Sequence, residues 1–269
     1  MMEPSKPLPS LASTKDKDND LKFWNQAARR YSQFIDSGDI FRKHLLDPVI
    51  LSWLKDANDK KILDAGCGQG YLANATNDLG AEVIGIDGSD QMIKIAKERY
   101  RRSSLNFLQA DLRDQMPFRD AEFDGVVANL VLMDFDPIDG TLKEFYRILK
   151  PNGVFIFSIL HPAFASGELG KTFTEFLFHK PPHYRIFHYI SPFKKIRNLG
   201  NLGIYTHYYH RPLEYYFKVL KESSFVVTDL CEPVFDKDFI RNKNNFLKLC
   251  AEVPIFLILK GQKSAGAIN

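Results

Sequence analysis

The sequence predicts an α/β fold: a largely parallel, doubly wound sheet, with helices before it and an inserted cap after its fifth strand. From Lys60 onward, short apolar runs alternate with helical segments over short connections, which is the pattern of βαβ units. A chain of 269 residues is long enough to bury the core of one such domain. Hydrophobic residues make up 45% and charged residues 26%, as in ordinary globular proteins, so we expect most of the chain to fold.

The N-terminal region is predicted to be a tail followed by helices. Residues 1–20 are rich in Pro, Ser, Lys and Asp and offer little to bury, so we expect a disordered tail. The next stretch, "LKFWNQAARRYSQFI", places Trp24 and Tyr31 on an apolar face at helical spacing. A second helical stretch covers residues 41–54, with an interruption at its proline. Residues 21–56 should therefore form a helical cap.

Five apolar runs between residues 57 and 160 are predicted to be the strands of a ligand-binding core. They read "KILDAG", "EVIGID", "LNFLQAD", "FDGVVANLVL" and "GVFIFSIL". Helices begin at Gly70 and behind the N-cap candidate Ser89, and a third lies in "DPIDGTLKEFYRILK". This winding leaves a crevice at the carboxyl ends of the strands, where ligands bind. Residues 212–262 complete the core with a helix and two strands, and residues 263–269 form a tail.

Residues 161–211 break the alternation and are predicted to form an aromatic cap over the substrate. The segment is rich in Phe and Tyr and interrupted by prolines, so it is too apolar for a solvated linker. Its basic residues can hold an acidic group, pair with RNA, or form a solvated face. They include Lys180, Arg185, Lys194, Lys195 and Arg197. The aromatic residues alternate with prolines rather than with a dense basic stripe, which favours a lid over a small molecule.

The stretch "ILDAGCGQG" places glycines at alternate positions directly behind a strand. Gly66, Gly68 and Gly70 let the chain turn sharply and let a ligand approach bare backbone and the next helix. Dinucleotides and S-adenosylmethionine both use such a turn, but the dinucleotide pattern is G-x-G-x-x-G. The carboxylate of Asp64 would repel a pyrophosphate and attract the ammonium of an amino-acid ligand. Its sign therefore favours S-adenosylmethionine.

Two further carboxylates end the strands that follow. Asp87 closes "EVIGID" and can accept hydrogen bonds from both ribose hydroxyls of either ligand, so it does not discriminate. Asp111 closes "LNFLQAD", where it can accept from an adenine amino group beside the Leu112 amide. Each aspartate alone is equally well explained as a cap or turn residue. Three carboxylates ending successive parallel strands favour a ligand site instead.

From about Trp24 to Lys260, the chain resembles the class I S-adenosylmethionine-dependent methyltransferases. The segments that carry the resemblance are "LDAGCGQG", "VIGIDGSDQMIKIAK", "QADLRDQMPF", "FDGVVANLVLMDFDP" and "RILKPNGVFIFSILHP". The preface ending in "DPVILSWL" and the later "HRPLEYYFKVLKESSF" resemble the branch that acts on small molecules, which includes quinone-biosynthesis and carrier-protein carboxyl methyltransferases. The resemblance implies a Rossmann-like, seven-stranded sheet in which "VPIFLILKG" is the one antiparallel strand.

The resemblance also implies which residues hold S-adenosylmethionine. The glycine turn would surround the methionine half, the second aspartate the ribose, and the third the adenine. Asn129 would lie where cofactor and substrate meet, and Tyr31 resembles a tyrosine that closes over the cofactor. The full set of cofactor-binding candidates is Asp64, Gly66, Gly68, Gly70, Asp87, Gly88, Met92, Asp111, Leu112, Asn129 and Tyr31.

His161 is the candidate catalytic residue. It ends the fifth strand in "SILHPAF", so it should face the mouth of the crevice as a general base or as a substrate contact. The alternative is a turn residue packed under the cap beside Pro162. The candidate substrate contacts are Trp24, His161 and Phe164, although a tryptophan on an apolar helical stripe is also explained by packing.

Other ligand classes find little support in the sequence. No metal site is expected, because prolines break the spacing of His179 and His183, and no Cys or carboxylate completes a set with His207 and His210. The three cysteines are scattered, which argues against disulfides and fits a reducing compartment. A net charge of +3 makes nucleic acid an improbable partner. No signal peptide or membrane span is evident, so we expect a cytoplasmic protein, whose oligomeric state stays open.

The sequence thus predicts an S-adenosylmethionine-dependent methyltransferase acting on a small molecule by in-line displacement. O-methylation is slightly favoured over N- or C-methylation, because a histidine base is available to an acceptor hydroxyl. One alternative is an NAD(P)-dependent oxidoreductase, which shares the glycine turn. Another is a methyltransferase-like domain that binds a partner without catalysis.

Overall fold

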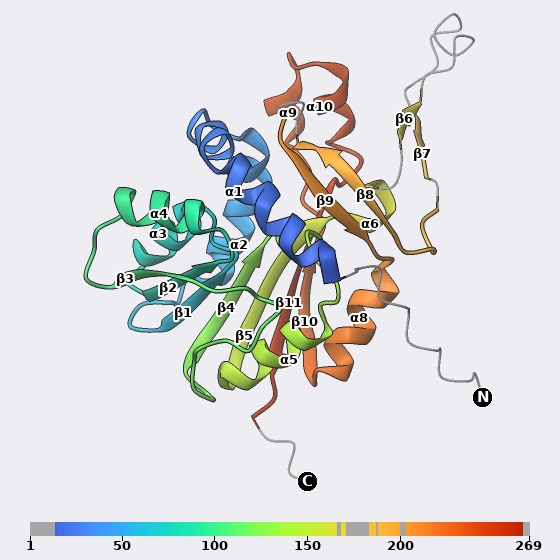
Figure 1. Cartoon of the computed structure of the whole chain (residues 1–269). Helices are drawn as coiled ribbons and strands as arrows, with labels where there is room; N and C mark the ends of the chain where they lie inside the picture. The colour runs from blue at the N-terminus through green and yellow to red at the C-terminus, as the bar shows by residue number, and fades with distance from the viewer. Residues whose placement is uncertain (1–13, 166–167, 171–182, 187, 200–202, 266–269) are drawn as a thin grey trace, which may run out of the picture.

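A seven-stranded sheet forms the centre of the molecule. The computed structural model describes residues 14–165, 168–170, 183–186, 188–199 and 203–265. The strands are β1 (Lys61–Ala65), β2 (Glu82–Asp87), β3 (Leu105–Gln109), β4 (Phe123–Asn129), β5 (Leu149–Leu160), β10 (Phe225–Cys231) and β11 (Phe256–Lys263). Their order is β10-β11-β5-β4-β1-β2-β3 (Figure 1). Only β11 runs antiparallel, to both β5 and β10, which confirms the predicted fold class.

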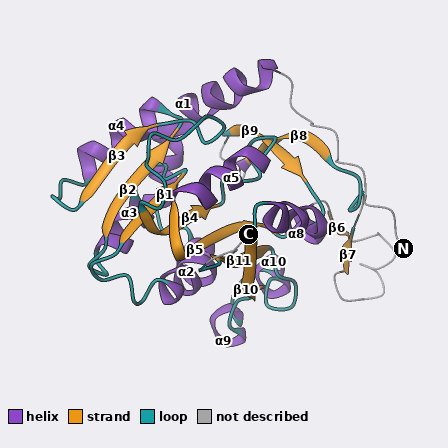
Figure 2. Cartoon of the chain, turned by 90° about the horizontal axis from the view of Figure 1, so that it is seen from below, coloured by secondary structure: helices purple, strands orange, loops and turns teal. Residues whose placement is uncertain are grey.

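Helices cover both faces of the sheet. They include α3 (Tyr71–Asn77), α4 (Asp90–Arg99), α5 (Asp139–Ile148) and α8 (Leu213–Glu222). Figure 2 shows α5 and α8 on one side and α2 and α3 on the other. Neighbouring strand residues enter different cores: Phe155 and Phe157 pack with α5 and α8, whereas Ile156 packs with α3. Burying each such side chain stabilises the fold by about 1.5–3 kcal/mol.

The N-terminal helix α1 spans Thr14–Asp36, so the prediction of a disordered tail is wrong for residues 14–20. The Lys- and Asp-rich composition suggested a solvated segment, but its carboxylates find cations elsewhere in the chain. Asp16 is 6% exposed, and its Oδ1 lies 2.8 Å from the Lys194 Nζ. Asp20 is 5% exposed and pairs with Arg113 at 2.9 Å. Long-range ion pairs therefore hold the first turns of the helix against the core.

Two boundaries differ from the sequence expectation. The predicted helix over 41–54 is a π-helical turn, Arg42–Leu46, followed by α2 (Asp47–Trp53). Pro48 lies in the first turn of α2, where its missing N–H is tolerated. β4 ends at Asn129, although the apolar run continues, because Leu130 adopts a φ of +58° and turns the chain. The strand thus ends within the site described below.

The segment after β5 begins with α6 (Pro162–Ala165) and contains two antiparallel strand pairs. The first pairs β6 (Glu168–Gly170) with β7 (His183–Arg185), and the second pairs β8 (Phe193–Asn198) with β9 (Tyr205–His210). The second pair packs on α1 through β9. Within the predicted cap, residues 166–167, 171–182, 187 and 200–202, which include His179 and Lys180, lie outside the described residues. Two short helices, α9 (Lys237–Ile240) and α10 (Asn245–Leu249), separate β10 from β11.

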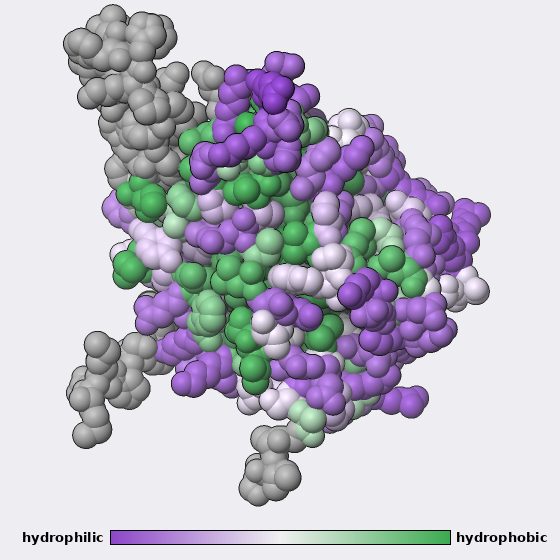
Figure 3. All heavy atoms as spheres, turned by 180° about the vertical axis from the view of Figure 1, so that it is seen from behind, coloured by the Kyte–Doolittle hydropathy of each residue, from purple (hydrophilic) through white to green (hydrophobic). Residues whose placement is uncertain are grey.

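The surface is mixed in character. Seen from the side opposite to Figure 1, hydrophobic residues form an irregular band between mostly polar flanks (Figure 3). None of the described helices is both long and apolar enough to cross a bilayer.

Candidate functional site

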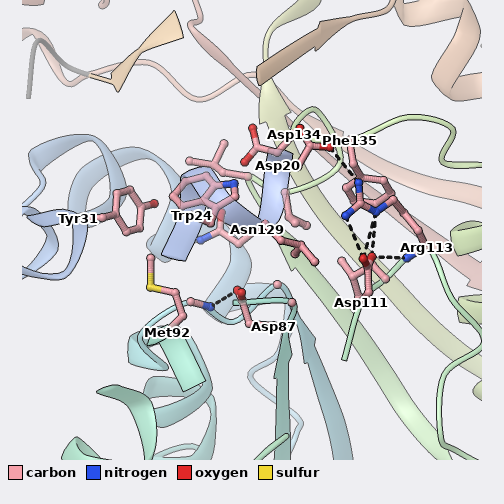
Figure 4. Close-up of a pocket in the computed structure, with 17 residues that line it drawn as sticks. Asp20, Trp24, Tyr31, Asp87, Met92, Asp111, Arg113, Asn129, Asp134 and Phe135 are labelled. Atoms are coloured by element: carbon pink, nitrogen blue, oxygen red, sulfur yellow. Dashed lines mark hydrogen bonds and ion pairs between the residues drawn. The ribbon is translucent and has the colours of Figure 1, made fainter. Parts of the chain in front are cut away.

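A cavity of about 690 Å³, including its open mouth, lies at the carboxyl ends of the parallel strands beneath α1. Figure 4 shows Tyr31 at one end and Asp111 with Arg113 at the other. The lining residues are Asp20, Leu21, Trp24, Tyr31, Gly66, Gly68, Asp87, Gly88, Met92, Asp111, Leu112, Arg113, Asn129, Leu130, Val131, Asp134 and Phe135. Most of the candidates predicted from the sequence are thus brought together.

A second cavity of about 350 Å³ adjoins the first, because Tyr31, Gly66, Gly68 and Asn129 line both. It reaches behind the glycine turn toward the π-helical segment. Its remaining lining residues are Ile35, Arg42, Asp64, Cys67, Gln69, Tyr71 and Leu72. Asp64 therefore lies in this smaller chamber, apart from the other two predicted aspartates.

The glycine turn fits the prediction at two of its three positions. Gly66, Gly68 and Gly70 all adopt positive φ angles, of 76°, 52° and 85°. A Cβ at Gly68 would meet no described heavy atom within 4 Å, so its backbone faces open space. Gly70 lines neither cavity: a Cβ there would lie 2.6 Å from the Phe107 Cζ. Its small size serves the packing of α3 against the sheet.

Asp87 links the glycine turn to the start of α4. Its Oδ2 accepts a hydrogen bond from the Gly68 amide at 2.9 Å, and its Oδ1 accepts from the Ser89 amide at 2.8 Å. Burial raises the pKa of Asp87 to about 6, although these two amides lower it, and the charge of Asp111 raises it further. The carboxylate is held rigidly and still lines the cavity.

Asp111 lines the cavity as predicted, but its carboxylate is engaged by Arg113. The Arg113 Nε and Nη2 donate to Asp111 Oδ1 and Oδ2, each at 2.9 Å. Burial opposes ionisation of Asp111, but hydrogen bonds from Arg113 and the nearby charge of Lys17 lower its pKa overall. Arg113 was not among the site residues predicted from the sequence; it stands beside Leu112 and bridges to Asp20 on α1.

Asp64 and Arg42 carry buried polar atoms without hydrogen-bond partners among the described residues. Asp64 is 3% exposed, and its Oδ2 accepts no hydrogen bond. Burial raises the pKa of Asp64 to about 7, and the charge of Asp87 adds to the shift. Arg42 is 7% exposed, and its Nη1 donates to no described atom. Its Nη2 donates to the Tyr31 hydroxyl. Opposite charges thus line one small chamber with hydrogen-bonding capacity left over.

Asn129 is fixed by its neighbours at the end of β4. Its Nδ2 donates to the Tyr71 hydroxyl at 2.8 Å, and the Ser158 hydroxyl donates to its Oδ1. The Tyr71 hydroxyl in turn donates to Asp47 Oδ1 at 3.1 Å. This chain sets the orientation of the amide where the two cavities meet.

Helix α1 covers the cavity along its length. Leu21 lies against Gly88, where a Cβ would come within 2.4 Å of the leucine Cδ2. The rings of Trp24 and Tyr31 meet edge to face with centroids 5.2 Å apart, and both line the cavity. Trp24 and Tyr31, both predicted from the sequence as site residues, thus lie together over the cavity.

His161 and Phe164 lie outside both sets of lining residues, so the structure does not bring them to the site. The His161 Nε2 contacts Glu232 Oε1 at 2.7 Å, and its Nδ1 accepts from the Ala163 amide at 3.2 Å. Burial lowers the pKa of His161, while Glu232 opposes the shift. Both ring nitrogens are therefore engaged, and His161 has a structural role in the turn that follows β5.

The two histidines of β9, His207 and His210, also have structural partners. The His207 Nδ1 lies 2.6 Å from Asp20 Oδ1, and the His210 Nε2 lies 2.7 Å from the carbonyl oxygen of Tyr189. Across the described part of the chain, no three His, Cys, Asp or Glu side chains are grouped as metal ligands.

Comparison with known proteins places these features in a family context. Residues 63–157 match the model of the family described as "Methyltransferase domain". The chain is 37% identical over 100 residues to a malonyl-[acyl-carrier protein] O-methyltransferase of Enterobacter lignolyticus, covering 37% of this chain and 39% of that protein. It is 31% identical to a ubiquinone biosynthesis O-methyltransferase of Idiomarina loihiensis, covering 58% and 65%. The chain thus spans about half the length of the curated relatives it matches.

Solved structures share the fold. An S-adenosylmethionine-dependent methyltransferase from Mesorhizobium loti superposes with a TM-score of 0.68 at 20% identity, covering 80% of this chain and 96% of that one. A structure from Listeria monocytogenes, described as a possible enzyme of the same class, gives 0.67 at 24% identity with the same coverage. The family match covers the strands from β1 to β5, which carry the glycine turn and the aspartates. Residues 63–157 are therefore similar in sequence to a methyltransferase domain, and the chain shares its fold with solved S-adenosylmethionine-dependent methyltransferases.

Proposed function

We propose that this protein transfers a methyl group from S-adenosylmethionine to a small-molecule acceptor by in-line displacement. One observation carries the proposal: Asp64 and Arg42, of opposite charge, share a buried chamber beside the glycine turn and keep unpartnered atoms there. An amino-acid tail carries an ammonium and a carboxylate. Its ammonium complements Asp64, and its carboxylate complements Arg42, so both orphaned groups gain partners.

The same arrangement argues against a dinucleotide. A pyrophosphate at the glycine turn would face the carboxylates of Asp64 and Asp87, and like charges in a buried site are strongly disfavoured. A dinucleotide also has no ammonium group that could pair with Asp64. The oxidoreductase alternative is therefore the weaker candidate.

The larger cavity suits the nucleoside half of the cofactor. Asp87 keeps lone pairs for the ribose hydroxyls, because each of its oxygens accepts only one backbone amide. Met92 and Leu112 supply apolar surface for the purine. Because Arg113 occupies the Asp111 carboxylate, we assign the adenine edge to the backbone near Leu112 as well as to Asp111.

When bound, the cofactor supplies the methyl group as a sulfonium, an electrophile that needs no metal. The residues of the chain orient the reactants and exclude water. Helix α1 excludes water by placing Leu21, Trp24 and Tyr31 over the cavity. His161 takes no part in this chemistry, because both of its ring nitrogens are engaged outside the cavity.

Binding calorimetry tests the proposal. We expect the purified protein to bind S-adenosylmethionine and S-adenosylhomocysteine, and NADH not at all. Asp87→Asn should weaken both adenosyl ligands at least about tenfold, since a charged hydrogen-bond acceptor is lost. Asp114→Asn is the matched control, because that carboxylate lies at the surface beside Lys17 and outside both cavities. Binding of NADH without the adenosyl ligands would overturn the proposal.

A second experiment addresses catalysis. The protein is incubated with methyl-labelled S-adenosylmethionine and a fractionated extract of its source cells, and the labelled product is followed by chromatography. Label entering a small molecule supports the proposed function. Cofactor binding without transfer to any fraction would favour the non-catalytic alternative.

A further inference from the structure

The side of the cavity opposite Asp87 is lined by two carboxylates that the cofactor assignment leaves unused. Asp134 follows β4, and Asp20 belongs to α1. They are 6% and 5% exposed, and both line the cavity. Figure 4 shows them close together, across the cavity from Asp87. Their charges act on one another, since Asp20 contributes to the raised pKa of Asp134.

Two of the side chains that pair with these carboxylates lie outside the cavity lining. The Arg197 Nη2 on β8 is 2.6 Å from Asp134 Oδ1, and His207 on β9 contacts Asp20. Among the described lining residues, Arg113 is the one cation, and Asp111 and Asp20 both engage it. A molecule entering this side therefore meets carboxylate oxygens, which accept hydrogen bonds, and no free cation.

On the basis of the proposed function, we propose that the methyl acceptor presents an amine or a hydroxyl rather than a carboxylate, and that Asp134 receives its hydrogen bond and then its proton. A carboxylate acceptor would face two buried like charges, which strongly disfavour it. An N–H or O–H group instead finds an acceptor held in place by Arg197, which acts as a positioning residue.

The reaction balances with these groups. A lone pair on the acceptor nitrogen or oxygen forms the new bond to the methyl carbon while the carbon–sulfur bond breaks. The electron pair of that bond stays on sulfur, which becomes a neutral thioether. The acceptor's proton passes to the Asp134 carboxylate, which later returns it to water.

The surroundings of Asp134 suit this exchange. The charged groups acting on it are Arg197 from β8, Asp20 from α1 and Arg42 from the π-helical segment. Burial raises the pKa of Asp134 to about 7, while Arg197 lowers it. A group with a pKa near neutrality can both take and release a proton during turnover.

Sinefungin tests the inference without knowledge of the acceptor. It shares the nucleoside and amino-acid parts of S-adenosylhomocysteine but carries a primary ammonium where the methyl sulfonium would be. We expect the protein to bind sinefungin at least about tenfold more tightly than S-adenosylhomocysteine, as a charged hydrogen bond to Asp134 implies. The preference should grow between pH 6 and 8, because Asp134 ionises while the ammonium stays charged.

Variants separate this inference from the proposed function. Asp134→Asn should remove most of the sinefungin preference and its pH dependence, while the affinity for S-adenosylhomocysteine stays within about twofold. Asp114→Asn should leave the preference unchanged. An unaltered preference in Asp134→Asn, or no preference in the parent protein, overturns the inference. Failure of both ligands to bind the parent protein would instead refute the proposed function.

The chemistry of the labelled product gives a second readout. Alkali releases labelled methanol from a methyl ester but not from a methyl ether or a methylamine. We expect the label in the product to be stable to alkali. Release as methanol identifies a carboxylate acceptor and overturns the inference.

Discussion

Arg42→Met should weaken binding of the amino-acid part of the cofactor while leaving the fold intact. Arg42 is buried, and its Nη1 has no hydrogen-bond partner among the described residues. A hydrogen bond between charged groups contributes about 1.5–3 kcal/mol, which corresponds to roughly 10- to 150-fold in affinity. Methionine has a similar apolar stem and cannot donate, so the variant removes the charge without opening a large cavity.

The free protein should respond differently. Without ligand, Arg42 is a buried cation whose ion pair with Asp39 is long, at 3.4 Å between Nε and Oδ2. Because this pair is long, losing the cation should cost less than breaking a well-formed buried ion pair. Asp39 stays paired, because its Oδ1 also accepts from the Phe41 amide at 3.0 Å. We therefore expect Tm to stay within a few degrees of the parent value, or to rise.

The assay compares two ligands by calorimetry. S-adenosylhomocysteine carries the amino-acid tail, whereas 5′-methylthioadenosine lacks it and keeps the nucleoside. Arg42→Met should weaken only the first, and Arg102→Met, which removes an arginine 44% exposed at the surface, should weaken neither. An equal loss for both ligands, or no loss for either, would refute the assignment of Arg42 to the ligand carboxylate.

Three further outcomes follow from the structure. Gly68→Ala should weaken S-adenosylhomocysteine binding, because its φ of +52° strains an alanine by about 1 kcal/mol; Gly70→Ala should instead lower Tm, because its Cβ would lie 2.6 Å from Phe107. Arg211→Met should lower the free energy of unfolding, measured in urea, by about 3–5 kcal/mol, because the buried guanidinium donates to backbone carbonyls and a carboxylate after β4. An Arg211→Lys variant as stable as the parent protein would contradict this reasoning. Asp64 has a folded-state pKa of about 7, above its unfolded value, so its contribution to the stability of the free protein should fall as pH rises from about 4 to 7. Binding should release protons near pH 6.5, seen as buffer-dependent heats that Asp64→Asn diminishes.

The part of the site carried by the parallel strands was predictable from sequence. Asp64, Asp87 and Asp111 each follow a short apolar run, and in a parallel sheet such positions meet at one edge. In the structure, Asp87 and Asp111 line one cavity and Asp64 lines the adjoining one. Local periodicity and turn residues were sufficient because each unit of strand and helix is determined by its own neighbours in the chain.

His161 shows where that local logic failed. Its place at the end of β5 was predicted correctly, but the side chain's direction depends on what pairs with the strand. There, Glu232 captures its Nε2, and the backbone of Ala163 occupies its Nδ1. Glu232 directly follows β10, and Ala163 lies in the turn after β5. The residue spacing within "SILHPAF" therefore could not predict these hydrogen bonds.

The site residues that were not predicted from the sequence share a physical property: each is positioned by an ion pair with a residue far away in the chain. Asp20 was placed in a tail because its neighbours are polar, yet it pairs with Arg113, 93 residues later. Asp134 carried no motif, and its arginine lies 63 residues away on a hairpin. Such pairs form only where tertiary packing brings charges together, and buried charges persist only when paired. The side of the cavity that we assign to the cofactor is therefore specified by local motifs of the strands. The side that we assign to the acceptor is built by the segments that surround them, so under this assignment the identity of the acceptor depends on contacts that only the folded chain defines.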